Sequence, residues 1–333
     1  MNDLPISRRR LLTVTAAATA LLPLAAYATG SGRRSEALPE MVRWTGRALG
    51  ANSEIRLYHT DRAAANEAIA QSVAELERLE RIFNLFHPDS ALSQLNRAGR
   101  LDDPPLDLVR ALEESNAMAE ATDGAFDVTV QPLWALYADV LARTGLPPSE
   151  AELARVRPLI GWRQVEVSTD RIRLPQSGMA LTFNGMGQGY ITDRVAELLV
   201  RHGFPHVLVD LGELRAPAGL PDGSPWSVAV RNPDDWTRDL RRLSLADGGL
   251  ATSEAYGSSF RPGGHDGHIL DPERLRPALS VASVTVRAAT ATRADLLSTA
   301  IAVAGSARAQ AILRAGGGES ALLMDDRGRI ATI

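Results

Sequence analysis

The pattern of apolar, glycine and polar positions is most informative between residues 180 and 211. A short apolar run at 180–183 is typical of a strand, and glycines stand at positions 185, 187 and 189. An amphipathic run follows, with apolar residues at three- and four-residue steps, and Gly203 is placed to end it as a helix-terminating glycine. A second strand is expected at 206–211. These elements predict a strand, a glycine loop, a helix and a strand.

Such a unit can hold a phosphate group. Glycines let the backbone approach a ligand, and a helix N-terminus directs N–H groups and about half a positive charge towards it. The loop lacks the third glycine of a dinucleotide fingerprint, and no GKS or GKT follows it. The alternative is a glycine turn that merely joins strand to helix.

The rest of the pattern predicts an α+β fold, because hairpins are mixed with helices and no clean linker separates two domains. Ser149 and Glu152 form a capping box for one of the helices, which should run to about residue 156. Further helices are expected at 61–86, 90–96, 106–121, 294–304 and 307–315. Strands and hairpins are expected at 42–58, 125–130, 165–174, 226–231, 243–245, 281–286 and around a turn at 325–328.

The first residues are typical of an export signal. Arg8, Arg9 and Arg10 precede an apolar stretch that ends in the small-residue pattern Ala26-Tyr27-Ala28. Paired arginines before two leucines indicate the twin-arginine route, which exports folded proteins. We therefore expect a signal peptide at 1–28, a flexible mature N-terminus at 29–40, one domain at 41–333 and a periplasmic location. The alternative is an uncleaved membrane anchor.

Composition narrows the chemistry. The 36 basic residues are all arginine, so kinase chemistry with a P-loop lysine and Schiff-base chemistry are excluded. A formal net charge of −4 argues against a nucleic-acid-binding protein, because such proteins usually carry a net positive charge. The absence of cysteine rules out disulfides and thiolate metal sites.

Two stretches offer ligand contacts. Residues 122–129 (TDGAFDVT) offer backbone N–H groups, an aromatic ring and carboxylates to a ligand. The structural alternative is a helix end followed by a buried strand. His268 follows a glycine-rich segment that could bring it near a substrate, and histidine exchanges protons near neutral pH. The structural alternative for His268 is a strand end. His265 is a weaker candidate.

Asp295 and Thr299 stand at positions i and i+4 of a predicted helix. A carboxylate and a hydroxyl on one helical face suit Mg²⁺, which prefers oxygen ligands and often completes its shell with phosphate oxygens. The competing interpretation is a capping box formed by Thr292 and Asp295 at the helix start. The stretch alone favours capping.

Taken together and in this order, these stretches resemble the ApbE family of FAD:protein FMN transferases. The resemblance covers residues 49–303 and rests on SALSQLNR, TDGAFDVTVQPLW, FNGMGQGYITDRVAELL, VLVDLGE, HILDP and ADLLSTA. It implies one α/β domain of mixed, largely antiparallel sheets that binds FAD and Mg²⁺. The implied reaction cleaves the FAD pyrophosphate, attaches FMN to a Ser or Thr hydroxyl of an extracytoplasmic flavoprotein and releases AMP. A membrane electron-transfer subunit is the expected acceptor.

The resemblance also assigns site residues. It implies His268 and Asp295 as catalytic residues, and Asp295, Thr299 and the carbonyl of Gly185 as magnesium ligands. The implied flavin-nucleotide contacts are Leu49, Ala125, Phe126, Asp127, Thr182, Gln188, Ile269 and Leu270.

Several positions depart from the pattern of the family. Thr182 and Gln188 stand where many members carry Asp and Lys, and Leu49-Gly50-Ala51 replaces a Met-Gly-Thr. Glu273-Arg274-Leu275 stands in place of the usual Thr-Gly. Losing an Asp and a Lys together keeps the local charge balanced but could weaken FAD binding or slow transfer. Alternative functions are therefore a non-catalytic FAD carrier, an Mg²⁺-dependent FAD pyrophosphatase, and an assembly factor for a membrane redox complex.

Overall fold

The computed structural model describes residues 39–255, 260 and 267–333. The predicted signal peptide, nearly all of the predicted flexible N-terminus and His265 lie outside the described residues. The boundaries of the domain expected at 41–333 stay a prediction. Among the described residues, no helix combines the length and the apolar character that crossing a membrane requires.

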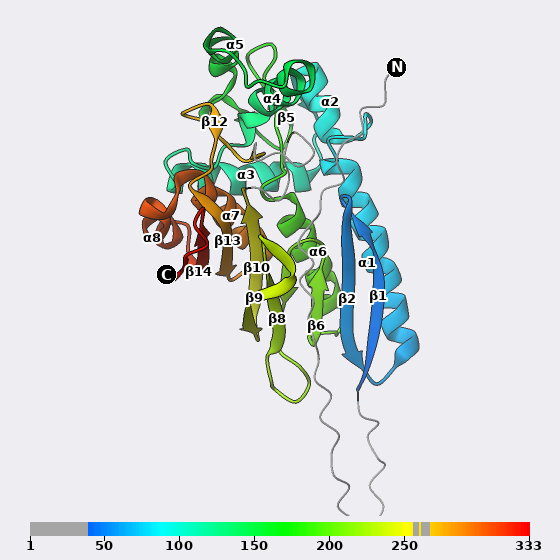
Figure 1. Ribbon diagram of the computed structural model, residues 1–333. Coiled ribbons are helices and arrows are strands. Elements are labelled where there is room, and N and C mark those ends of the chain that lie inside the picture. Colours follow the sequence, from blue (N-terminus) through cyan, green and yellow to red (C-terminus); the bar gives the residue numbers. More distant parts are fainter. Residues whose placement is uncertain (1–38, 256–259, 261–266) are drawn as a thin grey trace, which may run out of the picture.

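An eight-stranded sheet forms the centre of the molecule, in the order β1-β2-β6-β7-β10-β13-β14-β15 (Figure 1). Its neighbouring strands pair antiparallel throughout. Its strands are β1 (Glu40–Ala48), β2 (Ala51–His59), β6 (Val207–Asp210), β7 (Leu214–Ala216), β10 (Gly248–Glu254), β13 (Val281–Ala288), β14 (Gly318–Asp325) and β15 (Ile330–Thr332). The expectation of an α+β fold with largely antiparallel sheets is confirmed.

Three smaller sheets complete the strand inventory of the described residues. They are a hairpin of β8 (Trp226–Asn232) and β9 (Asp235–Leu245), a pair of β11 (Leu270–Asp271) and β12 (Arg276–Pro277), and a three-stranded sheet of β3 (Arg100–Asp102), β5 (Arg171–Arg173) and β4 (Glu166–Val167).

The helices α1, α6 and α7 pack on one face of the central sheet, and α3, α4 and α5 lie beyond one end of it (Figure 1). The α-helices are α1 (Arg62–Phe83), α2 (Ala91–Ala98), α3 (Leu106–Ala121), α4 (Gln131–Thr144), α5 (Glu150–Val156), α6 (Gly187–Arg201), α7 (Ala291–Ala304) and α8 (Ser306–Ala315). Short 3₁₀ turns occur at Val128–Val130, Arg157–Leu159 and Trp162–Gln164.

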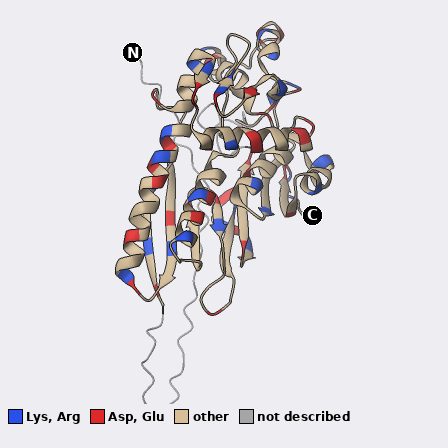
Figure 2. Cartoon of the chain, turned by 180° about the vertical axis from the view of Figure 1, so that it is seen from behind, with Lys and Arg blue, Asp and Glu red and all other residues tan. Residues whose placement is uncertain are grey.

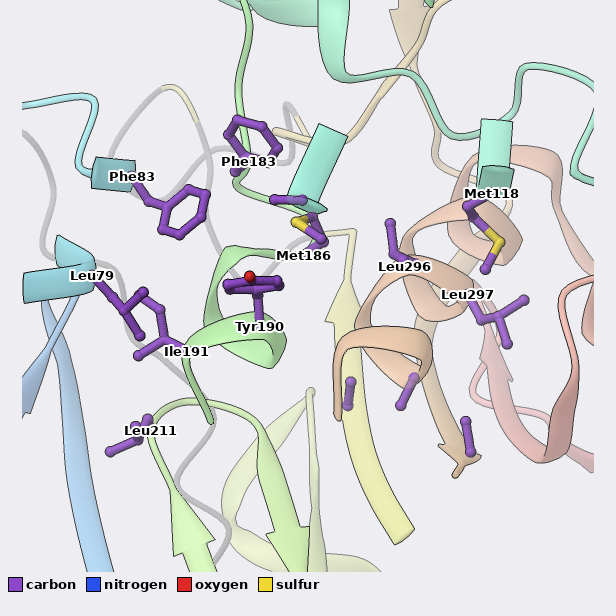
Figure 3. Packing of buried hydrophobic residues seen from close by; sticks show 14 of the residues in the cluster. Leu79, Phe83, Met118, Phe183, Met186, Tyr190, Ile191, Leu211, Leu296 and Leu297 are labelled. Atoms are coloured by element: carbon purple, nitrogen blue, oxygen red, sulfur yellow. The ribbon is translucent and has the colours of Figure 1, made fainter. Parts of the chain in front are cut away.

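Successive side chains of β6 point to opposite faces of the sheet and join two separate hydrophobic clusters. Val207 and Val209 belong to the large cluster beneath the helices, whereas Leu208 between them packs against the β8–β9 hairpin on the opposite face. On the helix side, the rings of Phe83 and Tyr190 lie 5.4 Å apart between centroids, and Phe83 and Phe183 lie 5.3 Å apart (Figure 3). These aromatic contacts fix α6 against α1 and against the segment that leads into α6.

Charges of both signs are distributed over the surface. Arginine and acidic residues are interspersed along α1, whereas α8 carries arginine alone and β14 carries acidic residues alone (Figure 2). This mixture agrees with the small negative net charge of −4.

Most predicted elements are confirmed, but two predicted strands are wrong. Residues 125–130 form a turn and a 3₁₀ turn, because Asp127 accepts a hydrogen bond from the Thr129 N–H and Pro132 then favours the start of α4, which the pattern did not predict. Residues 180–183 find no strand partner. Instead, Asn96 bonds both backbone groups of Leu181, at 2.7 and 2.9 Å, and the Thr182 N–H donates to the Val128 carbonyl.

Candidate active site

A cavity of about 160 Å³ opens where α6, α7, β10 and the segment before α4 meet. Part of its lining is apolar, and the rest carries carboxylates, hydroxyls and two amides. The described residues that line it are Ala125, Phe126, Asp127, Val130, Trp134, Thr182, Asn184, Gly185, Gln188, Glu213, Thr252, Ser253, Glu254, His268, Ile269, Leu270, Pro272, Asp295, Thr299 and Val303. Every predicted site residue except Leu49 belongs to this set.

Leu49 lies in the turn between β1 and β2 instead. Its N–H donates to the side chain of Glu80 on α1, and its side chain packs against the main core. The structure therefore does not bring Leu49 to the cavity that the other predicted residues share.

The start of α6 meets α7 at very short range. A Cβ on Gly189 would lie 2.5 Å from the Ala291 carbonyl oxygen and 2.9 Å from the Cβ of Asp295. Gly189 is thus required for the approach of the two helices. This contact lets the Gly189 N–H donate to Asp295 Oδ2 at 3.1 Å.

The prediction that all three glycines form a phosphate-binding loop before the helix is wrong. Gly187 and Gly189 lie inside the first turn of α6, and only Gly185 precedes the helix. The N–H groups of Met186 and Gly187 donate to the Phe183 carbonyl, and that of Gly189 donates to Asp295. The start of α6 therefore holds a carboxylate of its own chain rather than a row of open donors.

Asp295 is not part of a capping box at the start of α7. The cap of α7 is Thr290, whose hydroxyl accepts from the Arg293 N–H at 3.1 Å. Thr292 donates its hydroxyl proton to the carboxylate of Asp193 on α6. The capping interpretation is wrong, because Asp193 and Thr290 together satisfy the N–H groups at the start of α7.

Four oxygen groups, from Gly185, Ser253, Asp295 and Thr299, lie close together in the cavity lining. The Thr299 hydroxyl lies 3.4 Å from the Gly185 carbonyl oxygen, and Asp295 lies one helical turn before Thr299 on the same face of α7. Ser253 Oγ lies 3.2 Å from Thr299 Oγ1. Because carboxylate, carbonyl and hydroxyl oxygens are hard donors, this set fits Mg²⁺ with waters or phosphate completing the shell. The described residues contain no cluster of three or more His, Cys, Asp or Glu suited to a metal.

Burial raises the pKa of the carboxyls around this set. The pKa of Asp295 is raised to about 7 by burial, although the hydrogen bond from Gly189 opposes the shift. Burial and the negative charge of Asp295 together raise the pKa of Glu213 well above its ordinary value. Burial also raises the pKa of Glu254 to about 7. A cation bound here would favour the charged forms of these groups.

Phe126 and Asp127 have different roles in the wall. The Phe126 ring is 4% exposed and would lie 3.2 Å from a Cβ added to Gly185, so it closes one side of the oxygen set. Asp127 accepts from the N–H groups of Thr129 at 2.8 Å and Trp162 at 3.1 Å. The Asp127 carboxylate thus also holds the local backbone in place.

Residues 268–270 and Pro272 complete the cavity lining. His268, Ile269 and Leu270 all line the cavity, and Leu270 begins β11. Among the described lining residues, His268 is the only basic side chain. Thr182 also lines the cavity and is buried, and its hydroxyl accepts from the Asn184 N–H at 3.2 Å.

Glu213, Glu254 and Asn96 were not predicted as site residues from the sequence. Glu213 and Glu254 stand at strand ends, where acidic residues are ordinarily solvated, and only VLVDLGE pointed towards Glu213. Asn96 lies in SALSQLNR, and only a helix at 90–96 was expected there. Its amide instead positions the segment that leads to Thr182 and Gly185.

Comparison with known proteins gives a consistent result. A model of the ApbE family matches residues 49–323. A protein named FAD:protein FMN transferase from Klebsiella pneumoniae (strain 342) is 28% identical over 280 residues, covering 81% of this chain and 80% of that protein. The FAD:protein FMN transferase of Treponema pallidum (strain Nichols) is 29% identical over 298 residues, covering 83% of this chain and 82% of that protein.

The fold also matches solved structures. The apo form of the flavinyl transferase ApbE from Pseudomonas stutzeri superimposes with a TM-score of 0.76 and 27% sequence identity. The superposition covers 89% of this chain and 94% of that one.

Proposed function

The chain belongs to the ApbE family, and we propose that it is an FAD:protein FMN transferase. One observation carries the proposal: Asp295, Thr299 and the Gly185 carbonyl converge beside an apolar wall formed by Phe126, Val130 and Trp134. Such a cavity can take a nucleotide that has phosphates at one end and a planar ring at the other.

Mg²⁺ would be held by Asp295, Thr299 and the Gly185 carbonyl. When bound, it would supply positive charge to the pyrophosphate oxygens and to the developing charge on the leaving AMP. The protein contributes the placement of these donors. The short contact at Gly189 and the bond from its N–H hold Asp295 in position.

In the proposed reaction, the hydroxyl oxygen of a Ser or Thr of an acceptor protein forms a bond to the phosphorus of the FMN moiety. The bond from that phosphorus to the bridging oxygen breaks, and AMP leaves. His268, which lines the cavity, is the group we assign to take the hydroxyl proton, because imidazole accepts protons near neutral pH. The apolar wall limits access of water, which would divert FMN to hydrolysis.

Incubation of the protein with FAD, Mg²⁺ and a candidate acceptor tests this function. Flavin that stays on the acceptor after denaturation, with one AMP released per flavin, is the expected result. Free FMN with AMP would instead indicate a pyrophosphatase. Intact FAD would indicate a carrier or an assembly factor and would overturn the proposal.

We also propose export through the twin-arginine route to the periplasm, where the acceptor would be an extracytoplasmic flavoprotein such as a membrane electron-transfer subunit. Support comes from the sequence of the leader, with Arg8 and Arg9 before two leucines. Replacement of both arginines with lysine should leave the precursor in the cytoplasm. Normal export of that double variant would contradict the proposed route.

A further inference from the structure

Glu254 ends β10 at the cavity, and one of its carboxyl oxygens has no hydrogen-bond partner. The residue is 7% exposed, and Oε1 lacks a partner among the described residues. A buried polar atom left without a partner costs free energy in the folded protein. The position of Glu254 in the cavity wall makes a ligand the candidate partner.

The other three carboxylates that line the cavity have partners, including Asp127, which accepts from the N–H groups of Thr129 and Trp162. Glu213 accepts from the Thr252 N–H at 3.1 Å, and Asp295 accepts from the Gly189 N–H at 3.1 Å. The described lining residues include no arginine that could neutralise Glu254. A phosphate group is a poor partner for Glu254 as well, because both groups carry negative charge. A neutral donor on a ligand would satisfy Glu254 without this repulsion.

Gln188, on the first turn of α6, presents the opposite polarity. Its Nε2 is buried, and it too lacks a hydrogen-bond partner among the described residues. The cavity thus contains one unmatched acceptor and one unmatched amide donor. Part of its lining is apolar and includes Val130, Trp134 and Leu270.

We propose that Glu254 accepts a hydrogen bond from an N–H of a planar heteroaromatic ring, beside a ring acceptor that Gln188 contacts. The inference rests on the proposed function, since FAD offers this chemistry twice. The isoalloxazine ring carries an N–H next to carbonyl oxygens, and adenine carries an exocyclic amine next to a ring nitrogen. Glu254 would then select the ring, while the oxygen set around Asp295 addresses the phosphates.

The proposal can be tested on the wild-type protein with pairs of ligands that differ only in whether the ring N–H donor is present. FMN and AMP are titrated into the wild-type protein with Mg²⁺, beside FMN methylated at the ring N–H and AMP dimethylated at the exocyclic amine. A loss of affinity of about tenfold for one methylated ligand, but not for the other, identifies the ring that Glu254 contacts. Equal affinity within both pairs would overturn the inference.

The variant Glu254→Leu provides a second, independent test of the proposal. It removes the unmatched acceptor, so we expect a melting temperature equal to or above that of wild type, together with about tenfold weaker FAD binding. Glu254→Leu should also bind the methylated and unmethylated forms of the selected ligand equally. A variant that loses stability while keeping its affinity for FAD would show a structural role and would overturn the inference.

Ser115→Ala is the matched control. Ser115 Oγ on α3 is also buried without a partner among the described residues, but it does not line the cavity. Its removal should leave FAD affinity unchanged. Wild-type protein that binds none of FAD, FMN and AMP would overturn the proposed function and this inference with it. Wild-type protein that binds FAD but does not respond to methylation would overturn this inference alone.

Discussion

Asp193 and Asp295 each bind the first turn of the helix that carries the other. Asp193 on α6 accepts from the N–H groups of Ala291 and Thr292 on α7, at 3.0 and 2.7 Å. Asp295 on α7 accepts from the N–H of Gly189 on α6. Each carboxylate faces the positive end of the partner helix. The position of the proposed metal ligand therefore depends on a residue that does not line the cavity.

Asp193→Asn should weaken metal binding as well as stability. The amide can accept only through one atom, and its NH₂ group would face an N–H of α7. We expect a loss of about 1–3 kcal/mol in unfolding free energy and a clearly raised Kd for Mg²⁺. Isothermal titration with Mg²⁺ and thermal melting would measure both.

The control for Asp193→Asn is Thr290→Ala. It removes the cap of α7, at a cost of about 1 kcal/mol, without touching either carboxylate. Its Mg²⁺ affinity should match that of wild type. If Thr290→Ala weakens Mg²⁺ binding as much as Asp193→Asn does, the reciprocal pair has no special role in positioning Asp295.

Asp295→Asn should abolish most activity with little change in melting temperature. Its amide oxygen can still accept from Gly189, but the formal charge is lost from the proposed metal site. A loss of about 3 kcal/mol of transition-state stabilisation would slow FMN transfer by roughly a hundredfold. Transfer rates measured against Mg²⁺ concentration would show it, and chelation of Mg²⁺ should stop the wild-type reaction. Full activity at low Mg²⁺ would remove Asp295 from the metal site.

Gly189→Ala should destabilise the protein more than Gly203→Ala. At Gly189 the new methyl group would meet the backbone of α7, and overpacking of this kind costs about 1–3 kcal/mol or more. At Gly203 there is open space, and the cost is only that of a positive φ of 88°. Urea unfolding of both variants would rank them. A smaller loss at Gly189 would contradict the close approach of α6 and α7.

The stability of the metal-free protein should depend on Glu254 in a defined pH range. Burial raises the pKa of Glu254 from 4.5 to about 7, so the folded protein binds more protons than the unfolded chain between these values. Its contribution to stability is therefore complete below about pH 4.5 and falls as the pH rises towards 7.

Glu254→Gln removes this titration. Relative to wild type, the variant should gain up to about 1.4 kcal/mol per pH unit in that range. Urea unfolding of both proteins at several pH values would measure the difference. A stability difference that does not change with pH would contradict the raised pKa.

Elements defined by the local pattern of apolar positions were predicted well from the sequence. The bounds of α3 were predicted at 106–121 as observed, because the pattern of apolar positions is a local property. The strands expected at 125–130 and 180–183 failed because side chains of Asp127 and Asn96 satisfy backbone groups that a strand would otherwise pair. Secondary-structure propensities do not show which side chain will bond to a given backbone group.

The site residues, too, were predicted only where the sequence itself, or the family resemblance, contained a signal for them. Asp295, Thr299 and Gly185 could be grouped because the family resemblance supplied their relationship, which spacing alone did not. Thr292 was assigned to a capping box because its spacing to Asp295 fits one, yet its true partner, Asp193, lies 99 positions away. Glu254 had no local signal, since only the fold buries it.

The two hydrogen bonds between Asn96 and Leu181 tie the cavity to a contact between distant parts of the chain. They join residues 85 positions apart, and closing a loop of that length costs roughly 4 kcal/mol of chain entropy. The pairing of β3 with β5 and the bond from the Leu174 N–H to the Gly99 carbonyl close nearly the same loop, so these contacts share that cost. A partly folded chain would therefore have little capacity to hold flavin, and retention of flavin would report that the whole chain has reached its native topology.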